Sequence, residues 1–515
     1  MKFFRKRLSI ALTTLFVFSF IIYLSVFSLL YISYARPDIP FVRNIMYSRI
    51  LYKASDVLID SGVGNLYFFN SGVLFNEKPD FVLKFSNNDL RHKDSLLQEI
   101  KSGQLPLLED WRKNWRKFEI VNGGEEINAK YKYHGSNSSP YIDGYESFTI
   151  KSDFPINGYR NFKLINGREM NYLNVFFNLI GHKFNLITED PGSIIATNSM
   201  GRIQDFFQYQ LFNEDYLEEK YGMVESLIIR RNTFWENNNN PKWHSSNLDN
   251  VTYNIDLNSI SKENFALWES LLNSPSEKNY DAEYLGRFLA LLQLFNHPHQ
   301  ITGNNDKWVI NNGKVYPVYR NEAHIEPIFL DEINTNSLFK KYWYSYSLEP
   351  YKSVLANNNV LIERNRTFKK LYESKVEITS LLDSVFYKHR HTHRRYNKKY
   401  LKLNYEFKYK KRVLEENLNI INNYLNSGHS LVLFDGEKIK LSSTRKNPLK
   451  VELNDKVFTF LPKEYTYNKN DMTINDSFNE LIIEDIGVID SLKIHDMILN
   501  KTLEIEKDYS ILRVN

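Results

Sequence analysis

The segment of the sequence with the clearest chemical potential is a small polar turn followed by a strand that ends in a lysine. The turn covers residues 134–141 (HGSNSSPY), and the alternating stretch 145–151 (YESFTIK) follows it. Backbone N–H groups of a Gly/Ser turn can hold phosphate oxygens, and a nearby lysine can neutralise their charge. The alternative is an ordinary Ser/Asn/Pro hairpin with one solvated lysine. The candidate phosphate-binding residues are His134, Gly135, Ser136, Ser138 and Lys151.

Further segments follow this turn in a recognisable order. After the turn HGSNSS and the strand SFTIK come FKLIN at 162–166, a helix-like stretch at 172–183, NSMG at 198–201 and EDYLEEKYG at 214–222. In order and spacing these segments resemble the CotH family, the spore-coat-type atypical protein kinases. That family carries an R-G-N-S-S-W-like turn, then K-S-Y-R-I-K, then K-x-x-L. The resemblance covers roughly residues 80 to 330.

The resemblance implies a phosphotransferase that binds ATP together with Mg or Mn. Phosphoryl transfer needs a cation on the phosphates, groups that hold a metal, and a carboxylate near the acceptor hydroxyl. The family's strand lysine corresponds to Lys151, and Lys163 is the second candidate. Where the family has the glutamate that orients this lysine, the sequence has Gln210, which carries no charge to pair with it.

The resemblance also implies a second half-site in the polar loop that follows the long helix 281–295. In one alignment Asp306 is the catalytic carboxylate. In the other, His299 occupies the catalytic position and Asn304 supplies an amide to the metal. After the next hairpin, Glu322 with Asn321 matches the metal-holding position, and magnesium accepts such oxygen ligands. Both alignments stay open, as does a degenerate pseudokinase site.

Two other chemistries are restricted by the residue types. The chain has no cysteine, which excludes disulfides, thiolate metal sites and a cysteine nucleophile. His297 and His299 with Asp306 suggest zinc, but no third ligand stands at a recognised spacing.

A basic segment indicates a second kind of partner. Residues 388–412 contain eleven lysines and arginines and a single acid, Glu406, with tyrosines between them. Such a stripe can bind anionic polymers or lipid headgroups, or it is a solvated helix face with its tyrosines packed. The candidate anion-binding residues are Arg390, Arg394, Arg395, Lys398, Lys399 and Lys402.

The N-terminus predicts a membrane anchor. Four basic residues within 2–7 precede an apolar run from 8 to about 34, which is longer than the roughly 20 residues that span a bilayer. A cleaved signal peptide, the alternative, has a shorter core and small residues at its cleavage site. We therefore expect a single-pass protein of the cell membrane with most of the chain extracytoplasmic, at a bacterial cell surface and with no nucleic-acid partner.

At 515 residues the chain exceeds one core, and its 42% hydrophobic and 25% charged residues are typical of a globular protein. We expect an α+β fold with an N-terminal transmembrane helix, a kinase-like two-lobed core, a helical segment and a C-terminal all-β domain. The expected divisions are a cytoplasmic tip and signal-anchor helix (1–37), a membrane-proximal adaptor (38–80), the CotH-like core (81–332), a helical segment with the basic helix (333–428) and a small β domain (429–515).

The sequence thus favours a membrane-anchored, outward-facing atypical kinase or pseudokinase that transfers phosphate from ATP to a surface or secreted protein. The alternative is a non-catalytic cell-surface assembly factor that binds an anionic wall or capsule polymer. The kinase depends on the Glu322 carboxylate, whereas the binding protein depends more on residues 388–412.

Overall fold

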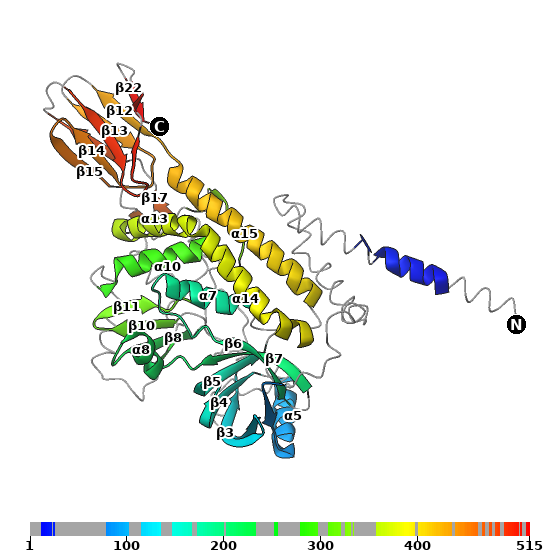
Figure 1. The fold of residues 1–515 in the computed structure, drawn as a ribbon. Coiled ribbons are helices and arrows are strands. Elements are labelled where there is room, and N and C mark those ends of the chain that lie inside the picture. Colours follow the sequence, from blue (N-terminus) through cyan, green and yellow to red (C-terminus); the bar gives the residue numbers. More distant parts are fainter. Residues whose placement is uncertain are drawn as a thin grey trace.

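The structure is a computed structural model, and it describes the following residues: 12–22, 24–25, 79–101, 115–134, 147–166, 172–199, 202–232, 252–255, 279–296, 307–320, 325–330, 333, 357–396, 400–434, 438–461, 466–468, 473–475, 479–484, 489–503, 505–506 and 511–514. These residues form a mixed α/β protein whose largest sheet is curled and almost entirely antiparallel. In Figure 1 a barrel, a group of helices and a terminal β unit follow one another along the molecule.

The expected N-terminal transmembrane helix is wrong. Within the described residues, none of the helices combines the length and the hydrophobicity needed to traverse a lipid bilayer. The predicted cell-surface location is a separate expectation and stays a prediction.

Seven strands close into a barrel in the order β1-β2-β3-β4-β5-β7-β6. All neighbours are antiparallel except β1 and β6, whose parallel pairing closes the barrel. Its elements are β1 (Phe81–Lys84), α5 (Asn87–Lys101), β2 (Arg116–Asn122), β3 (Glu125–Tyr133), β4 (Phe148–Ile156), β5 (Tyr159–Asn166), β6 (Ser193–Ser199) and β7 (Arg202–Gln210).

Alternation along the strands explains why they curl around one core. In β3 the residues Ile127, Ala129, Tyr131 and Tyr133 are buried, and the residues between them face outward. The inward side chains of the barrel strands form one apolar cluster with Phe148 at its centre. The outward side chains are therefore available to solvent or to the next unit.

The second unit contains a four-stranded sheet, ordered β11-β10-β8-β9, and most of the helices. Its elements are α7 (Tyr172–Lys183), α8 (Glu214–Tyr221), β8 (Leu227–Asn232), β9 (Thr252–Ile255), α10 (Ala282–Phe295), β10 (Lys307–Asn311), β11 (Lys314–Pro317), α13 (Asn358–Glu373), α14 (Lys375–Tyr396) and α15 (Tyr400–Asn426).

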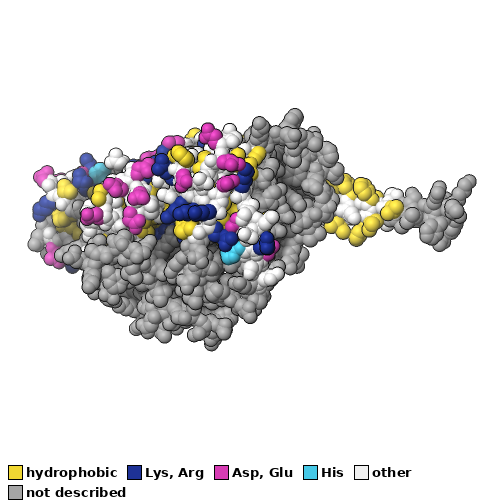
Figure 2. Space-filling view, turned by 90° about the horizontal axis from the view of Figure 1, so that it is seen from below, with side chains coloured by type: hydrophobic (Ala, Val, Ile, Leu, Met, Phe, Trp, Pro, Cys, Tyr) yellow, Lys and Arg dark blue, Asp and Glu magenta, His cyan; other side chains and the backbone are white. Residues whose placement is uncertain are grey.

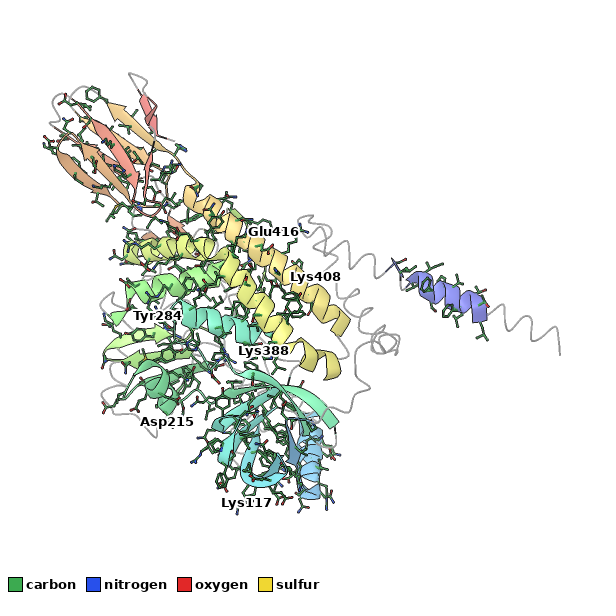
Figure 3. All side chains as sticks on the ribbon, in the orientation of Figure 1. Lys117, Asp215, Tyr284, Lys388, Lys408 and Glu416 are labelled. Atoms are coloured by element: carbon green, nitrogen blue, oxygen red, sulfur yellow. The ribbon has the colours of Figure 1, made fainter. Side chains whose placement is uncertain are left out.

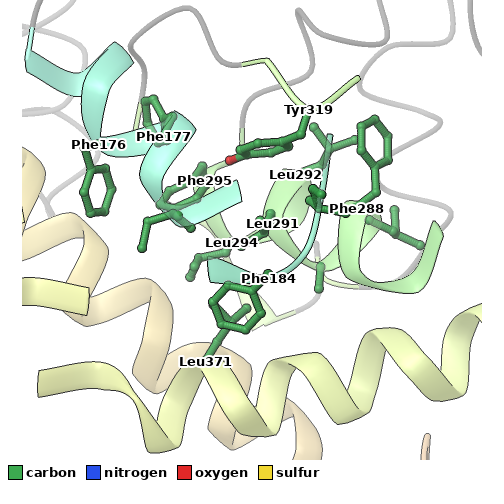
Figure 4. Packing of buried hydrophobic residues seen from close by; sticks show 14 of the residues in the cluster. Phe176, Phe177, Phe184, Phe288, Leu291, Leu292, Leu294, Phe295, Tyr319 and Leu371 are labelled. Carbon is green, nitrogen blue, oxygen red and sulfur yellow. The ribbon is translucent and has the colours of Figure 1, made fainter. Parts of the chain in front are cut away.

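The core of this unit lies where α7 and α10 meet. Nine of the twelve residues of α7 are buried, which is the pattern of a helix enclosed on most sides. Phe177 of α7 packs edge-to-face on Phe295 of α10 with ring centres 4.7 Å apart. Figure 4 shows these rings beside Phe288 and Tyr319 in the same cluster.

The C-terminal residues form a β unit of two principal sheets, ordered β18-β13-β12-β22-β21 and β15-β14-β19-β20, with the separate pair β16-β17. Side chains of both principal sheets share one apolar core, as in a sandwich. The strands are β12 (Ser430–Phe434), β13 (Ile439–Ser443), β14 (Leu449–Leu453), β15 (Lys456–Phe460), β16 (Thr466–Asn468), β17 (Thr473–Asn475), β18 (Asn479–Ile483), β19 (Leu492–Asp496), β20 (Lys501–Leu503), β21 (Ile505–Glu506) and β22 (Ile511–Val514).

Candidate functional site

A cluster of buried charges lies where the barrel meets the second unit. Its centre is Glu189, whose carboxylate pairs with the Lys307 ammonium; each residue is only 3% exposed. Arg320 Nε lies 3.7 Å from the other carboxylate oxygen of Glu189, and the Arg320 side chain is 20% exposed. The cluster is therefore closed around Glu189 and opens toward solvent on the arginine side.

Glu189 is placed by a chain reversal after α7. A Cβ at Gly181 would lie 2.3 Å from Thr188 Cγ2 and 2.7 Å from Tyr319 Cδ1, so only glycine lets the returning chain pack this closely. Thr188 and Tyr319 then form a parallel bridge, and the Tyr319 N–H donates to the Ile187 carbonyl over 2.7 Å. Since Glu189 and Arg320 are the next residues on each side, this bridge sets them beside each other.

Lys307 begins β10, in the middle of the four-stranded sheet, with Arg230 of β8 opposite it in register. Its backbone carbonyl accepts from the Val318 N–H over 2.9 Å. The Lys307 Nζ atom lies 5.1 Å from the centre of the Phe212 ring, so its charge has a carboxylate and an aromatic face as neighbours.

Lys163 brings the barrel to the same cluster. It points outward from β5, is 4% exposed, and its Nζ lies 5.4 Å from the centre of the Tyr209 ring. Burial by itself raises the pKa of Glu189. The positive charges of Lys307, Arg320 and Lys163 outweigh that effect and hold the pKa of Glu189 well below its usual value. Glu189 is therefore ionised at neutral pH.

Asp190 adds a second buried carboxylate. Its Oδ2 accepts the backbone N–H of Gln210 over 3.0 Å, and its backbone carbonyl accepts from Asn178 Nδ2 over 3.0 Å. Burial and a hydrogen bond with Asp190 both raise the pKa of Tyr159. With three cations (Lys163, Lys307, Arg320) and two carboxylates, the cluster carries a formal charge of +1. An excess positive charge with so little water around it favours an anion.

The two candidate lysines have different surroundings. Lys163 joins the charge cluster, whereas Lys151 is exposed on β4 with its Nζ 4.8 Å from the centre of the Trp115 ring. Gln210 does not face Lys163; its side-chain amide donates to Glu219 Oε2 over 3.4 Å. The carboxylate that acts on Lys163 is Glu189, which the sequence argument overlooked.

The remaining expected site residues are placed only in part. His134 Nδ1 lies 3.3 Å from Thr149 Oγ1 at the end of β3. The rest of the turn, the catalytic candidates and the metal candidates lie outside the described residues: Gly135, Ser136, Ser138, His299, Asn304, Asp306, Asn321 and Glu322. Nevertheless, Lys307 directly follows the segment 297–306 and Arg320 directly precedes 321–324, so both segments attach to the chain at the charge cluster.

Among the anion-patch candidates, the backbone of Arg390, Arg394 and Arg395 lies on α14 and that of Lys402 on α15; the structure does not describe their side chains. Lys398 and Lys399 lie outside the described residues. The end of the basic segment is engaged in ion pairs. Lys411 Nζ lies 2.6 Å from Asp383 Oδ2, and Arg412 Nε lies 2.8 Å from Glu416 Oε1. Figure 3 marks Lys388 and Lys408 on the two helices of this segment. Lys411 of the basic run therefore joins α15 to α14.

In the part of the chain that the structure describes, no group of three or more His, Asp or Glu side chains is arranged to hold a metal ion. No protein-family model matches the chain, and no curated protein matches it. The site therefore has to be interpreted from its own chemistry.

Glu189, Lys307 and Arg320 carry weak signals in the sequence. Glu189 and Asp190 follow the largely apolar segment 184–188 (FNLIT) and precede a Pro-Gly pair, and Lys307 stands directly before the apolar residues of β10. Charges at the edges of apolar segments are common on protein surfaces. Only the tertiary pairing of residues 118 positions apart identifies them as one site.

Proposed function

We propose that the chain binds the phosphate groups of ATP at the buried charge cluster and acts as a CotH-like phosphotransferase on a protein acceptor. The observation that carries the proposal is the convergence of Lys163, Lys307 and Arg320 on one glutamate, with a net positive charge. In this proposal Lys163, not Lys151, is the strand lysine of the phosphate site.

Phosphoryl transfer asks the protein mainly for positioning and for positive charge on the transferred group. Arg320, at the solvent side, meets the incoming phosphates first. Lys163 contributes charge from the barrel, and Glu189 keeps Lys307 and Arg320 in place. Because the site is largely buried, each charge acts through a lower dielectric than at the surface.

The resemblance assigns the remaining roles to residues outside the described parts. Asp306 serves the acceptor hydroxyl, or else His299 does so and Asn304 supplies an amide to the metal. Glu322 with Asn321 holds Mg or Mn. A bound divalent cation supplies further positive charge for the phosphates.

One observation favours a second candidate, a binding protein without turnover. In the family a glutamate orients the strand lysine for turnover. Here the helix α7 contains no acidic residue that could do so, and Glu189 is already paired with Lys307. A protein of this kind holds a phosphate-bearing polymer, such as an anionic wall or capsule polymer, by the same cluster without transferring the phosphate.

Thermal melting of the full chain with ATP, with and without Mg or Mn, tests the proposal. Binding at a hundred times the dissociation constant stabilises the folded state by about 2.7 kcal/mol, a shift of several degrees. We expect the shift to need the metal, to be lost in Lys163→Met and in Glu322→Ala, and to persist in Lys151→Met. No shift of the unaltered protein at millimolar nucleotide, in any metal, contradicts nucleotide binding irrespective of how the variants fold. A shift with inorganic polyphosphate but not with ATP and metal selects the binding protein.

A further inference from the structure

Three exposed lysines stand directly opposite one another across three neighbouring strands of the barrel. Lys117 of β2 is in register with Lys130 of β3, and Lys130 is in register with Lys151 of β4. All three face outward and are exposed. Figure 3 shows Lys117 at the outer surface of the barrel. We name these three residues the lysine ladder.

Residues directly opposite on antiparallel strands have Cβ atoms about 4.5–5.5 Å apart, and like charges at this spacing repel each other. In the described part of the chain, no acidic side chain forms an ion pair with a member of the ladder, whereas nearby Lys84 on β1 pairs with Glu126. Only solvent and salt therefore screen the repulsion between the ladder lysines in the described part of the chain, and a bound anion would reduce this repulsion.

Trp115 organises one side of the ladder. The Nζ atoms of Lys151 and Lys132 lie 4.8 Å and 5.1 Å from the centre of its ring. Two ammonium groups that share one indole lose part of their freedom before any ligand arrives. The ladder is thus partly pre-organised.

Two acidic residues border the ladder along the strand direction. Glu119 and Asp153 are exposed two positions further along β2 and β4, on the same outward face. A long polymer of uniform negative charge would meet these carboxylates, whereas a short acidic segment that crosses the strands along the ladder would not. The ladder spans roughly 10 Å across three strands. Two acidic side chains at alternate positions of an extended peptide, about 7 Å apart, fit within this span.

The ladder adjoins the charge cluster. Lys163 faces outward from β5 opposite Thr149 of β4, two residues before Lys151. Such diagonal neighbours on adjacent strands are about 7–8 Å apart. The same outward face therefore runs from the exposed ladder to the buried lysine of the proposed phosphate site. Figure 2, seen from below, shows lysine and arginine side chains beside acidic ones on the described surface.

We propose that the lysine ladder docks a short, extended acidic segment of the protein that accepts the phosphate. That the docked protein is the acceptor rests on the proposed function. The docking itself rests on the ladder, the tryptophan and the acidic borders.

Fluorescence anisotropy of a labelled peptide of alternating glutamate and serine, added to the full chain without nucleotide, tests the docking. We expect the dissociation constant to rise with salt. Replacing all three ladder lysines with glutamine should raise it on the order of tenfold or more. The matched control is Lys456→Gln, which removes an exposed strand lysine from β15 in the C-terminal unit. It should leave the affinity unchanged, and melting curves check that all variants are folded.

Equal affinity of the triple variant and the unaltered protein would overturn the proposal. So would binding of polyphosphate to the ladder without binding of the peptide, because the occupant would then be a polymer. Lys163→Met separates the two proposals, since it should abolish the nucleotide-dependent melting shift and leave peptide binding intact. Peptide binding without any nucleotide effect would refute the proposed function alone.

Discussion

Replacing Glu189 with glutamine should destabilise the protein strongly although the two side chains have nearly the same shape. The substitution removes the carboxylate that pairs with Lys307 and lies 3.7 Å from Arg320. The formal charge of the cluster, counted with Asp190, then rises from +1 to +2.

Two arguments set the size of the effect. Removing one partner of a buried ion pair typically costs about 3–5 kcal/mol, because the other charge stays buried without compensation. The cost also has a ceiling, because Lys307 can lose its proton. For a lysine with a usual pKa of about 10.4, this costs roughly 5 kcal/mol at pH 7. Both values predict a fall in melting midpoint of roughly 6–15 °C.

The stability lost in Glu189→Gln should depend on pH, whereas a loss of packing alone would not. Without its partner, the buried Lys307 should have a folded-state pKa below its unfolded value, since burial disfavours the charged form. The unfolded chain then binds more protons than the folded one, so the stability of the variant rises with pH until the unfolded lysine titrates. Calorimetry at pH 7 and pH 9.5 should therefore show a smaller deficit at the higher pH.

A double variant supplies the matched control. Adding Lys307→Met to Glu189→Gln returns the formal charge of the cluster to +1, and most of the lost stability should come back. A single variant within about 1 kcal/mol of the unaltered protein would refute the reasoning. So would a double variant that is destabilised by the sum of its two single changes, because the charges would then be independent.

Three further predictions concern residues that stabilise packing and hydrogen bonding within the fold. Gly181→Ala should cost about 1–3 kcal/mol, measured by thermal melting, because its Cβ would lie 2.3 Å from Thr188 Cγ2; an unchanged midpoint would show that the chain reversal is looser than described. Burial raises the pKa of Asp89. Hydrogen bonds from Ser86 and from Arg116 Nε, the latter 2.7 Å long, lower the pKa by more than burial raises it, so it lies below its usual value. Its contribution is thus present above the unfolded pKa near 4 and lost as the pH falls through the folded value, so Asp89→Asn should flatten the acid limb of a stability-against-pH curve. Asn447→Ala should cost about 1–3 kcal/mol in calorimetry, because the Asn447 amide is buried and donates to Asp496 Oδ2 over 2.8 Å; equal stability would show that these hydrogen bonds contribute little.

Local structure follows closely from the sequence where pattern and end signals agree. The expected helix 281–295 is confirmed as α10, because Asp281 accepts the Tyr284 N–H as its N-cap and Asn296 ends it in the left-handed region. The Asn-Gly-Gly sequence at 122–124 is likewise a hairpin signal, and it forms the turn between β2 and β3 with positive φ at Gly123 and Gly124.

The candidate site follows less well, and the two lysines show why. Alternation turns both Lys151 and Lys163 away from the barrel interior, so a strand pattern cannot separate them. They differ in what lies against them: Tyr209 and the charges of the second unit cover Lys163, whereas Lys151 is exposed beside Trp115, with Lys130 opposite it in register. Resemblance by spacing favours the exposed Lys151, whereas the site that we propose contains the buried Lys163.

The cluster also has a structural consequence for the whole core. The pKa of Glu189 is lowered by the charge of Lys163 from the barrel and by the charges of Lys307 and Arg320 from the second unit. The lowered pKa of Glu189 therefore depends on the two units being together, since separation would expose each group to water and weaken the attraction between the charges. An anion bound on the arginine side would offset the excess positive charge and be attracted by both units at once. Ligand binding should for that reason stabilise the contact between the units and not only the loops around the ligand. Under the proposed function, this electrostatic coupling would explain how buried charges that are costly for folding alone are retained.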